Sequence, residues 1–129
     1  MSEADAIKAV EAYFKAFNAE DGETIRSLLH YPHVIIADRR VIIMHDPSEF
    51  ISFSKGLSKR EGWHHSTLDS LKSVHTSEEK VHFTIEFSRY KADGTRYASY
   101  NGIWIMTKEG GNHWGLLVLS TSLDLLIIK

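Results

Sequence analysis

The chain has 129 residues, of which 43% are hydrophobic and 25% are charged, with a formal net charge of −2. These values are typical of one globular domain, and a charge so close to zero gives no electrostatic basis for binding nucleic acid or an anionic membrane. The chain contains no cysteine, which excludes disulfides, thiolate catalysis and cysteine-ligated metals.

The first part of the chain predicts two helices. Apolar residues recur at helical spacing at Ile7, Val10, Phe14 and Phe17, and the polar stretch 18–22 ends this stripe. Asp21 can cap a second, short helix that contains Ile25, Leu28 and Leu29. We expect Pro32 to stop that helix near His30.

A short hairpin and a third helix are expected next. The β-branched runs 34–36 and 41–43 flank a polar turn and predict the hairpin. Asp46-Pro47-Ser48-Glu49 then provides an N-cap, a proline suited to the first helical position and a capping-box glutamate. The predicted third helix presents Phe50, Phe53 and Leu57.

The remainder, from Trp63 to about Thr121, predicts four long strands joined by turns at residues 77–80, 92–95 and 109–112. Residues 81–90 alternate between apolar and polar side chains, whereas 102–106 and 114–119 are apolar on both faces. Helices cover one face, and we expect a homodimer through the outer sheet face to cover the other. The apolar tail 123–129 should extend the last strand or join that contact.

Helices followed by an antiparallel run of strands indicate an α+β fold. We predict three N-terminal helices packed on a strongly curved antiparallel sheet, made of the short hairpin and the four long strands. Such an arrangement encloses a pocket between the helices and the sheet. The acidic first residues lack the pattern of a signal peptide, and no apolar stretch approaches about 20 residues, so we expect a cytoplasmic protein with no membrane span.

This order of elements, with the stretch from Ala12 to Asp21 before the Ile25 helix, resembles the nuclear transport factor 2-like superfamily, specifically its SnoaL-like small proteins. The resemblance covers residues 1–129 as a single SnoaL-like domain. It implies a cone-shaped, cystatin-like sheet around a pocket, frequent homodimers, and functions that range from isomerases, dehydratases, hydrolases and polyketide cyclases to binding proteins without catalysis. Such a fold does not select among these functions.

Similarity to ketosteroid isomerases of this superfamily identifies two candidate catalytic residues. Tyr13 precedes the Asn18–Asp21 turn, as the tyrosine of those enzymes does. Asp38, near the hairpin, matches the position of their base if a shift of one residue is allowed. Their second acid would lie on residues 100–104, where only Asn101 is polar and near enough. The alternatives are that Asp38 simply opens a turn and that Tyr13 borders the apolar stripe.

His33 is the third catalytic candidate, because it lies between the second helix and the hairpin and would suit proton abstraction as a neutral base. A structural hydrogen bond is the alternative. The eight histidines show no metal-ligand spacing, and the neighbours His64 and His65 should point to opposite faces of a strand. We therefore predict no metal and no cofactor.

The expected pocket is apolar, and its ligand should be a small apolar molecule. The predicted ligand-binding residues are Phe17, Phe53, Trp63, Tyr100, Asn101 and Trp104. Arg89 ends the apolar face of its strand; it either directs its charge outward, which we prefer, or binds a ligand carboxylate.

Two functions remain open from the sequence. The first is binding of a small apolar molecule without established catalysis. The second is a cofactor-free acid–base enzyme of the isomerase, dehydratase or cyclase type that uses Tyr13, Asp38 and His33. The second function requires Asp38 or His33 to face the cavity.

Overall fold

The structure, a computed structural model, describes residues 2–122. The expectation for the tail 123–129 lies outside the described residues. The elements follow one another as α1 (Ser2–Asn18), α2 (Gly22–Leu28), β1 (Leu29–Ile36), β2 (Val41–Met44), η1 (Pro47–Glu49), α3 (Leu57–Glu61), β3 (Trp63–Thr76), β4 (Lys80–Lys91), β5 (Arg96–Glu109) and β6 (His113–Thr121).

The strands form one six-stranded sheet in the order β2-β1-β6-β5-β4-β3. The predicted hairpin is β1 with β2, and β3 to β6 are the four long strands, so the α+β prediction is confirmed. The sheet is mixed, however, because β1 runs parallel to β6, whereas we predicted an antiparallel sheet. Tight turns determine the direction of consecutive strands, but no turn joins β1 to β6, and only tertiary packing decides how these two strands meet.

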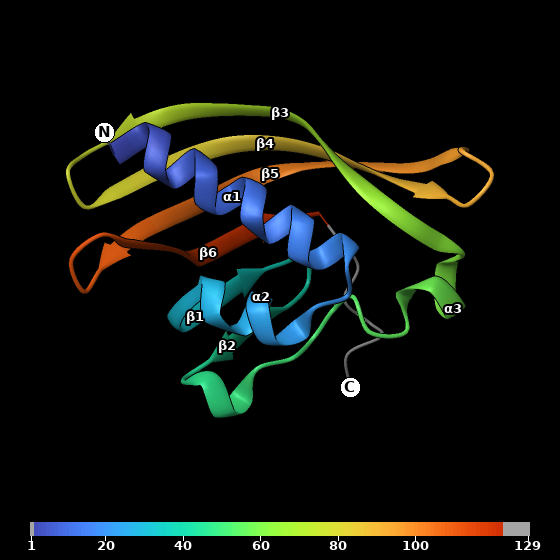
Figure 1. Ribbon diagram of the computed structural model, residues 1–129, viewed down its shortest axis with the longest axis horizontal. Coiled ribbons are helices and arrows are strands. Elements are labelled where there is room, and N and C mark those ends of the chain that lie inside the picture. Colours follow the sequence, from blue (N-terminus) through green and yellow to red (C-terminus); the bar gives the residue numbers. More distant parts are fainter. Residues whose placement is uncertain (1, 123–129) are drawn as a thin grey trace.

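The helices α1 and α2 lie on the same face of this curved sheet, with α1 crossing the long strands and α2 next to β1 (Figure 1). The predicted stripe of α1 is confirmed, since Val10, Phe14 and Phe17 are buried on the sheet. The ring of Phe14 stacks on that of Trp104 in β5, with 5.5 Å between the centroids. None of the described helices is long and apolar enough to cross a membrane.

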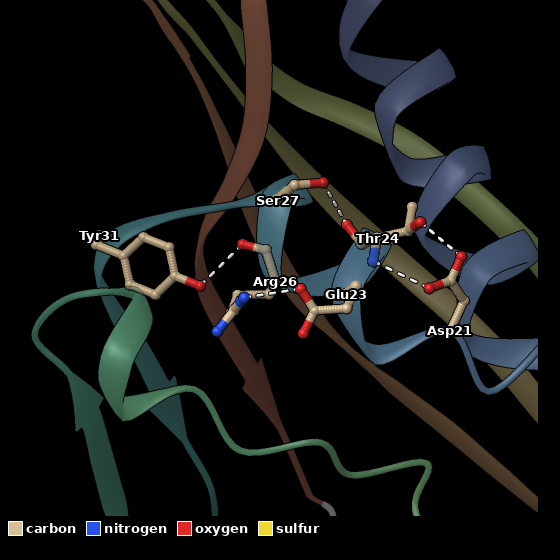
Figure 2. Close-up of polar contacts among 6 residues, drawn as sticks. All are labelled: Asp21, Glu23, Thr24, Arg26, Ser27 and Tyr31. Atoms are coloured by element: carbon tan, nitrogen blue, oxygen red, sulfur yellow. Dashed lines mark hydrogen bonds and ion pairs between the residues drawn. The ribbon is translucent and has the colours of Figure 1, made fainter.

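Asp21 caps α2, as predicted. One oxygen of its carboxylate accepts a hydrogen bond from the backbone N–H of Thr24 at 3.2 Å, and the other accepts from the Thr24 hydroxyl at 2.6 Å. At the other end of α2, the hydroxyl of Tyr31 in β1 donates to the carbonyl of Arg26 at 2.9 Å (Figure 2). These bonds satisfy backbone groups at both ends of a helix that is too short to be stable alone.

The predicted third helix is much shorter than expected. Asp46 does cap a helical turn, and Glu49 accepts from the backbone N–H of His45 at 2.7 Å, but the turn is a 3₁₀ helix that ends at Glu49. Phe50, with φ −57° and ψ 132°, is already outside the helical region, and the chain becomes helical again only in α3. The intervening segment is rich in serine and glycine, which are weak helix formers, so a good cap does not extend the helix.

The strand β4 confirms the predicted alternation. Val81, Phe83, Ile85 and Phe87 are all buried against the helical layer. The three predicted turns are also present, because they coincide with the gaps between consecutive strands of β3 to β6. The long strands therefore present one continuous apolar face on which the helices pack.

Candidate functional site

A cavity of about 130 Å³ lies between α1, the inner face of the sheet and the segment around α3. Aromatic and aliphatic side chains form most of its wall. Its lining residues are Tyr13, Phe14, Phe17, Ile35, Phe53, Leu57, Glu61, Ser66, Phe87, Arg89, Tyr100, Trp104 and Leu119. We call this space the main cavity.

The size of the main cavity indicates what it can hold. An apolar cavity of about 150 Å³ in another protein holds one benzene molecule. At about 130 Å³, the main cavity is close to that size and fits a body of about one aromatic ring.

The aromatic rings around the main cavity support one another. The ring of Tyr13 meets that of Trp104 edge to face, with 5.0 Å between the centroids. Phe87 and Tyr100, which are paired across β4 and β5, have centroids 5.3 Å apart. Rings at these distances attract each other and limit each other's rotation, so the wall is preformed.

The polar part of the wall centres on Arg89 in β4 and Glu61 at the end of α3. Nη1 of Arg89 lies 3.1 Å from Oε1 of Glu61, and the same carboxylate oxygen accepts a hydrogen bond from the Tyr97 hydroxyl at 2.7 Å. Burial and the bond to Glu61 raise the pKa of Tyr97, so this tyrosine remains a donor. Glycines with positive φ, Gly56 and Gly62, flank α3 and permit the sharp turns that bring Glu61 to the cavity.

Two side chains that line the main cavity each contain a buried nitrogen donor with no hydrogen-bond partner among residues 2–122: Nε of Arg89 and Nε1 of Trp104. The side chains of both residues are almost fully buried. The hydroxyl of Tyr13 is a third polar group of this wall. Burial raises the pKa of this hydroxyl to about 12, although the charge of Arg89 opposes the shift. The cavity is thus apolar, with several donor groups and a single cation.

The structure brings most of the predicted binding residues to this cavity. Phe17, Phe53, Tyr100 and Trp104 all line it. Trp63 lies behind the wall: its ring meets that of Phe17, with centroids 5.5 Å apart, and its Nε1 donates to Ser66 Oγ at 3.0 Å.

Asn101 is placed elsewhere. It is exposed and lines a separate depression together with Thr84 and Ile103, on the opposite face of the sheet from Tyr100. Consecutive residues of a strand point to opposite faces, so Tyr100 and Asn101 cannot both reach the main cavity.

The three predicted catalytic residues are not brought together. Tyr13 lines the main cavity, whereas Asp38 is exposed in the turn between β1 and β2 and lines neither this cavity nor the one next to it. His33 is buried at a smaller space of about 20 Å³ that shares Tyr13 and Phe17 with the main cavity. This smaller space has room for about one water molecule.

His33 also makes a structural hydrogen bond, since its Nδ1 lies 3.0 Å from the carbonyl of Leu116 in β6. A carbonyl can only accept, so Nδ1 is protonated and donates. Burial lowers the pKa of His33 to about 4, although hydrogen bonds to the backbone oppose the shift. The imidazole is therefore neutral at neutral pH.

The preferred sequence interpretation of Arg89 was wrong. Its exposed fraction is only 7%, so the side chain does not direct its charge into solvent. The alternation of β4 contains the signal, because Arg89 follows Phe83, Ile85 and Phe87 at two-residue spacing on the inner face. No pattern in the sequence indicated Glu61, which reaches Arg89 only because α3 folds back toward β4.

Several histidines form pairs. Nδ1 of His64 lies 3.0 Å from Nδ1 of His65, which corrects the expectation that these side chains point apart. A bulge in β3 between Trp63 and His65 interrupts the alternation and explains the difference. Within residues 2–122, no three histidine or carboxylate side chains form a group that could hold a metal ion.

The curved sheet with helices over a cavity defines the class of NTF2-like proteins with a cystatin-like fold. The chain belongs to the family described as NTF2-like protein (DUF6841), whose model matches residues 3–123. This confirms the superfamily that the sequence resembles. No curated protein matches this sequence.

Solved structures show the same fold. A protein of unknown function with a cystatin-like fold from Nostoc punctiforme is 9% identical, with a TM-score of 0.76 over 96% of this chain and 92% of that one. An NTF2-like protein from Novosphingobium aromaticivorans is 10% identical, with a TM-score of 0.75 over 97% of this chain and 83% of that one. A ketosteroid isomerase-like protein from Erwinia carotovora atroseptica is 20% identical, with a TM-score of 0.66 over 92% of this chain and 93% of that one. At such low sequence identities, the similarity to these structures shows that the fold is shared and nothing more.

Proposed function

We propose that the protein binds one small, largely apolar molecule in the main cavity. The observation that supports this proposal is the preformed aromatic wall around a space of about 130 Å³. A site built on a helix and a sheet loses little conformational freedom when a ligand enters, so even a small ligand can bind with useful affinity.

Catalysis is not part of this proposal. A cofactor-free acid–base mechanism would need a base that reaches the ligand. Asp38 lies outside the cavity wall, and His33 lines the smaller neighbouring space and not the main cavity. The name of the ketosteroid isomerase-like neighbour does not change this, because the geometry of the site, and not the fold, decides the chemistry.

The proposal is tested by titrating the protein with toluene and following amide and side-chain NMR shifts. We expect saturable shifts at residues of the main cavity, and quenching or a spectral shift of tryptophan fluorescence from Trp104. A Leu119→Phe variant should lose this binding, because the larger ring occupies the cavity. Leu117→Phe is the matched control, since Leu117 lies on the same strand but lines neither cavity. Absence of any saturable shift in the wild type would refute the proposal.

We also propose that the protein forms a homodimer through the outer sheet face. Ile103, Ile105 and Val118 are apolar residues of this face, and the exposed fraction of Ile103 in the single chain is 46%. Burying such a patch against a second copy removes apolar surface from water. Light scattering should give twice the mass of the chain, and Ile103→Lys should reduce it to the mass of one; a monomeric wild type would contradict this.

A further inference from the structure

We infer that the ligand of the main cavity is a small monocarboxylic acid whose carboxylate binds the guanidinium of Arg89. This inference rests on the proposed function, since it specifies the chemistry of the molecule that the cavity binds. It predicts a one-ring or branched aliphatic body among the aromatic side chains, with the acid group toward β4.

The first argument is the incomplete pairing of a buried cation. Arg89 is 7% exposed, and its only charged partner among residues 2–122 is Glu61. That carboxylate is 31% exposed and also accepts a bond from Tyr97, so it meets only part of the hydrogen-bonding capacity of Arg89. Nε of Arg89 is buried without an acceptor among residues 2–122. A buried cation whose hydrogen-bonding capacity is only partly met costs free energy, and a ligand acceptor at the N–H groups that face the cavity would recover part of it.

The second argument is the orientation of the guanidinium. Its central carbon lies 5.2 Å from the centroid of the Tyr100 ring, so one face of the group is occupied by an aromatic ring. The N–H donors lie in the plane of the guanidinium and point along its edges. A planar carboxylate fits such an edge and accepts two parallel hydrogen bonds, which suits arginine better than lysine.

The third argument concerns the neighbouring donors and the total charge. Trp104, whose side chain lines the same cavity, has a second buried donor, Nε1, without a partner among residues 2–122. Among these residues, the wall of the site contains one cation, Arg89, and the Glu61 carboxylate. A doubly charged phosphate would be repelled by Glu61 with only one cation to bind it, whereas a single negative charge is tolerated. These charges favour a monocarboxylate.

The test compares sodium benzoate with toluene by isothermal titration calorimetry and NMR. We expect wild-type protein to bind benzoate about ten- to a hundredfold more tightly than toluene, the range for a charge-assisted hydrogen bond to a buried group. Arg89→Met should remove this preference, so that the affinities for benzoate and toluene become about equal. The methionine side chain fills the space that the arginine leaves. Glu61 keeps its hydrogen bond from Tyr97 and its contact with water, so the substitution leaves no buried charge without a partner.

Two further variants keep the inference testable if Arg89→Met does not fold. Arg89→Lys preserves the charge without the planar fork and should weaken benzoate binding about tenfold. Glu61→Gln removes the competing carboxylate and should strengthen benzoate binding several-fold relative to toluene binding.

The outcomes separate the inference from the proposed function. If toluene binds and benzoate binds no more tightly, or if the preference survives Arg89→Met, the carboxylate inference is overturned and the proposed function stands. If neither probe binds, the proposed function fails as well. Tighter binding of benzoate that depends on Arg89 and increases in Glu61→Gln supports both.

Discussion

The side-chain amide of Asn18 makes two hydrogen bonds with the backbone of Ser66. Its Nδ2 donates to the Ser66 carbonyl at 2.9 Å, and its Oδ1 accepts from the Ser66 amide at 2.7 Å. These bonds join the end of α1 to β3 at the place where Ser66 lines the main cavity. One asparagine thus satisfies backbone groups of an edge strand and holds the helix that supplies Tyr13 and Phe17.

Asn18→Ala should lower the free energy of unfolding by about 1–3 kcal/mol, because both bonds are lost and backbone groups of Ser66 lose their partner. Urea denaturation followed by circular dichroism measures this change. Asn101→Ala is the matched control, since Asn101 is exposed on the other face of the sheet, and it should stay within about 0.5 kcal/mol of the wild type. Equal effects of the two variants would show that the Asn18 bonds do not stabilise the fold.

Gly102→Ala should destabilise the protein strongly. A Cβ atom at this position would lie 2.0 Å from the backbone oxygen of Ser120 in β6, so the pairing of β5 with β6 would have to shift. Such overpacking costs about 1–3 kcal/mol or more. Thermal denaturation provides the measurement, with Gly22→Ala as control, because a Cβ there meets only ordinary contacts at 3.5 Å and beyond. If Gly102→Ala melts at the wild-type temperature, the close approach of the two strands is wrong.

His33 should make stability depend on pH. Its pKa is lowered to about 4 in the folded state from the ordinary histidine value of 6.5, because the site is buried. The unfolded chain therefore binds more protons between these values, and the contribution of His33 is present above pH 6.5 and lost as the pH falls toward 4. The size of this loss is about 3 kcal/mol, at about 1.4 kcal/mol for each pKa unit.

Urea denaturation between pH 4.5 and 7 tests this dependence with His33→Asn. Asparagine retains a donor close to the position of Nδ1 but does not titrate, so the slope of stability against pH should be smaller than in the wild type. A slope in His33→Asn as steep as in the wild type would mean that His33 does not titrate across this range.

Asp38→Asn should leave toluene and benzoate binding unchanged, within about twofold. The side chain is exposed in the turn between β1 and β2 and does not line the main cavity. Calorimetry on this variant and on Leu119→Phe gives the comparison, because only the second changes the cavity wall. A large loss of affinity in Asp38→Asn would show that the β1–β2 turn participates in binding.

Local sequence patterns predicted the elements that depend on local physics. The stripe Val10-Phe14-Phe17, the Asp21 cap and the alternation of β4 are all present, because helix spacing, capping and strand alternation act over a few residues. The same local reasoning failed after Glu49, where a good cap is followed by residues that do not sustain a helix. It also failed at His64 and His65, because a bulge is decided by the strand on the other side.

The candidate site shows the same division. The sequence by itself determined that the inner face of the sheet is apolar and that Arg89 ends the apolar face of β4, although the preferred interpretation directed its charge outward. Only the tertiary structure decided that β1 runs beside β6, that α3 brings Glu61 within 3.1 Å of Arg89, and that Asp38 lies outside the cavity. These contacts join residues far apart in the chain, and their geometry depends on how the helices and the curved sheet pack together, which no spacing within a single element encodes.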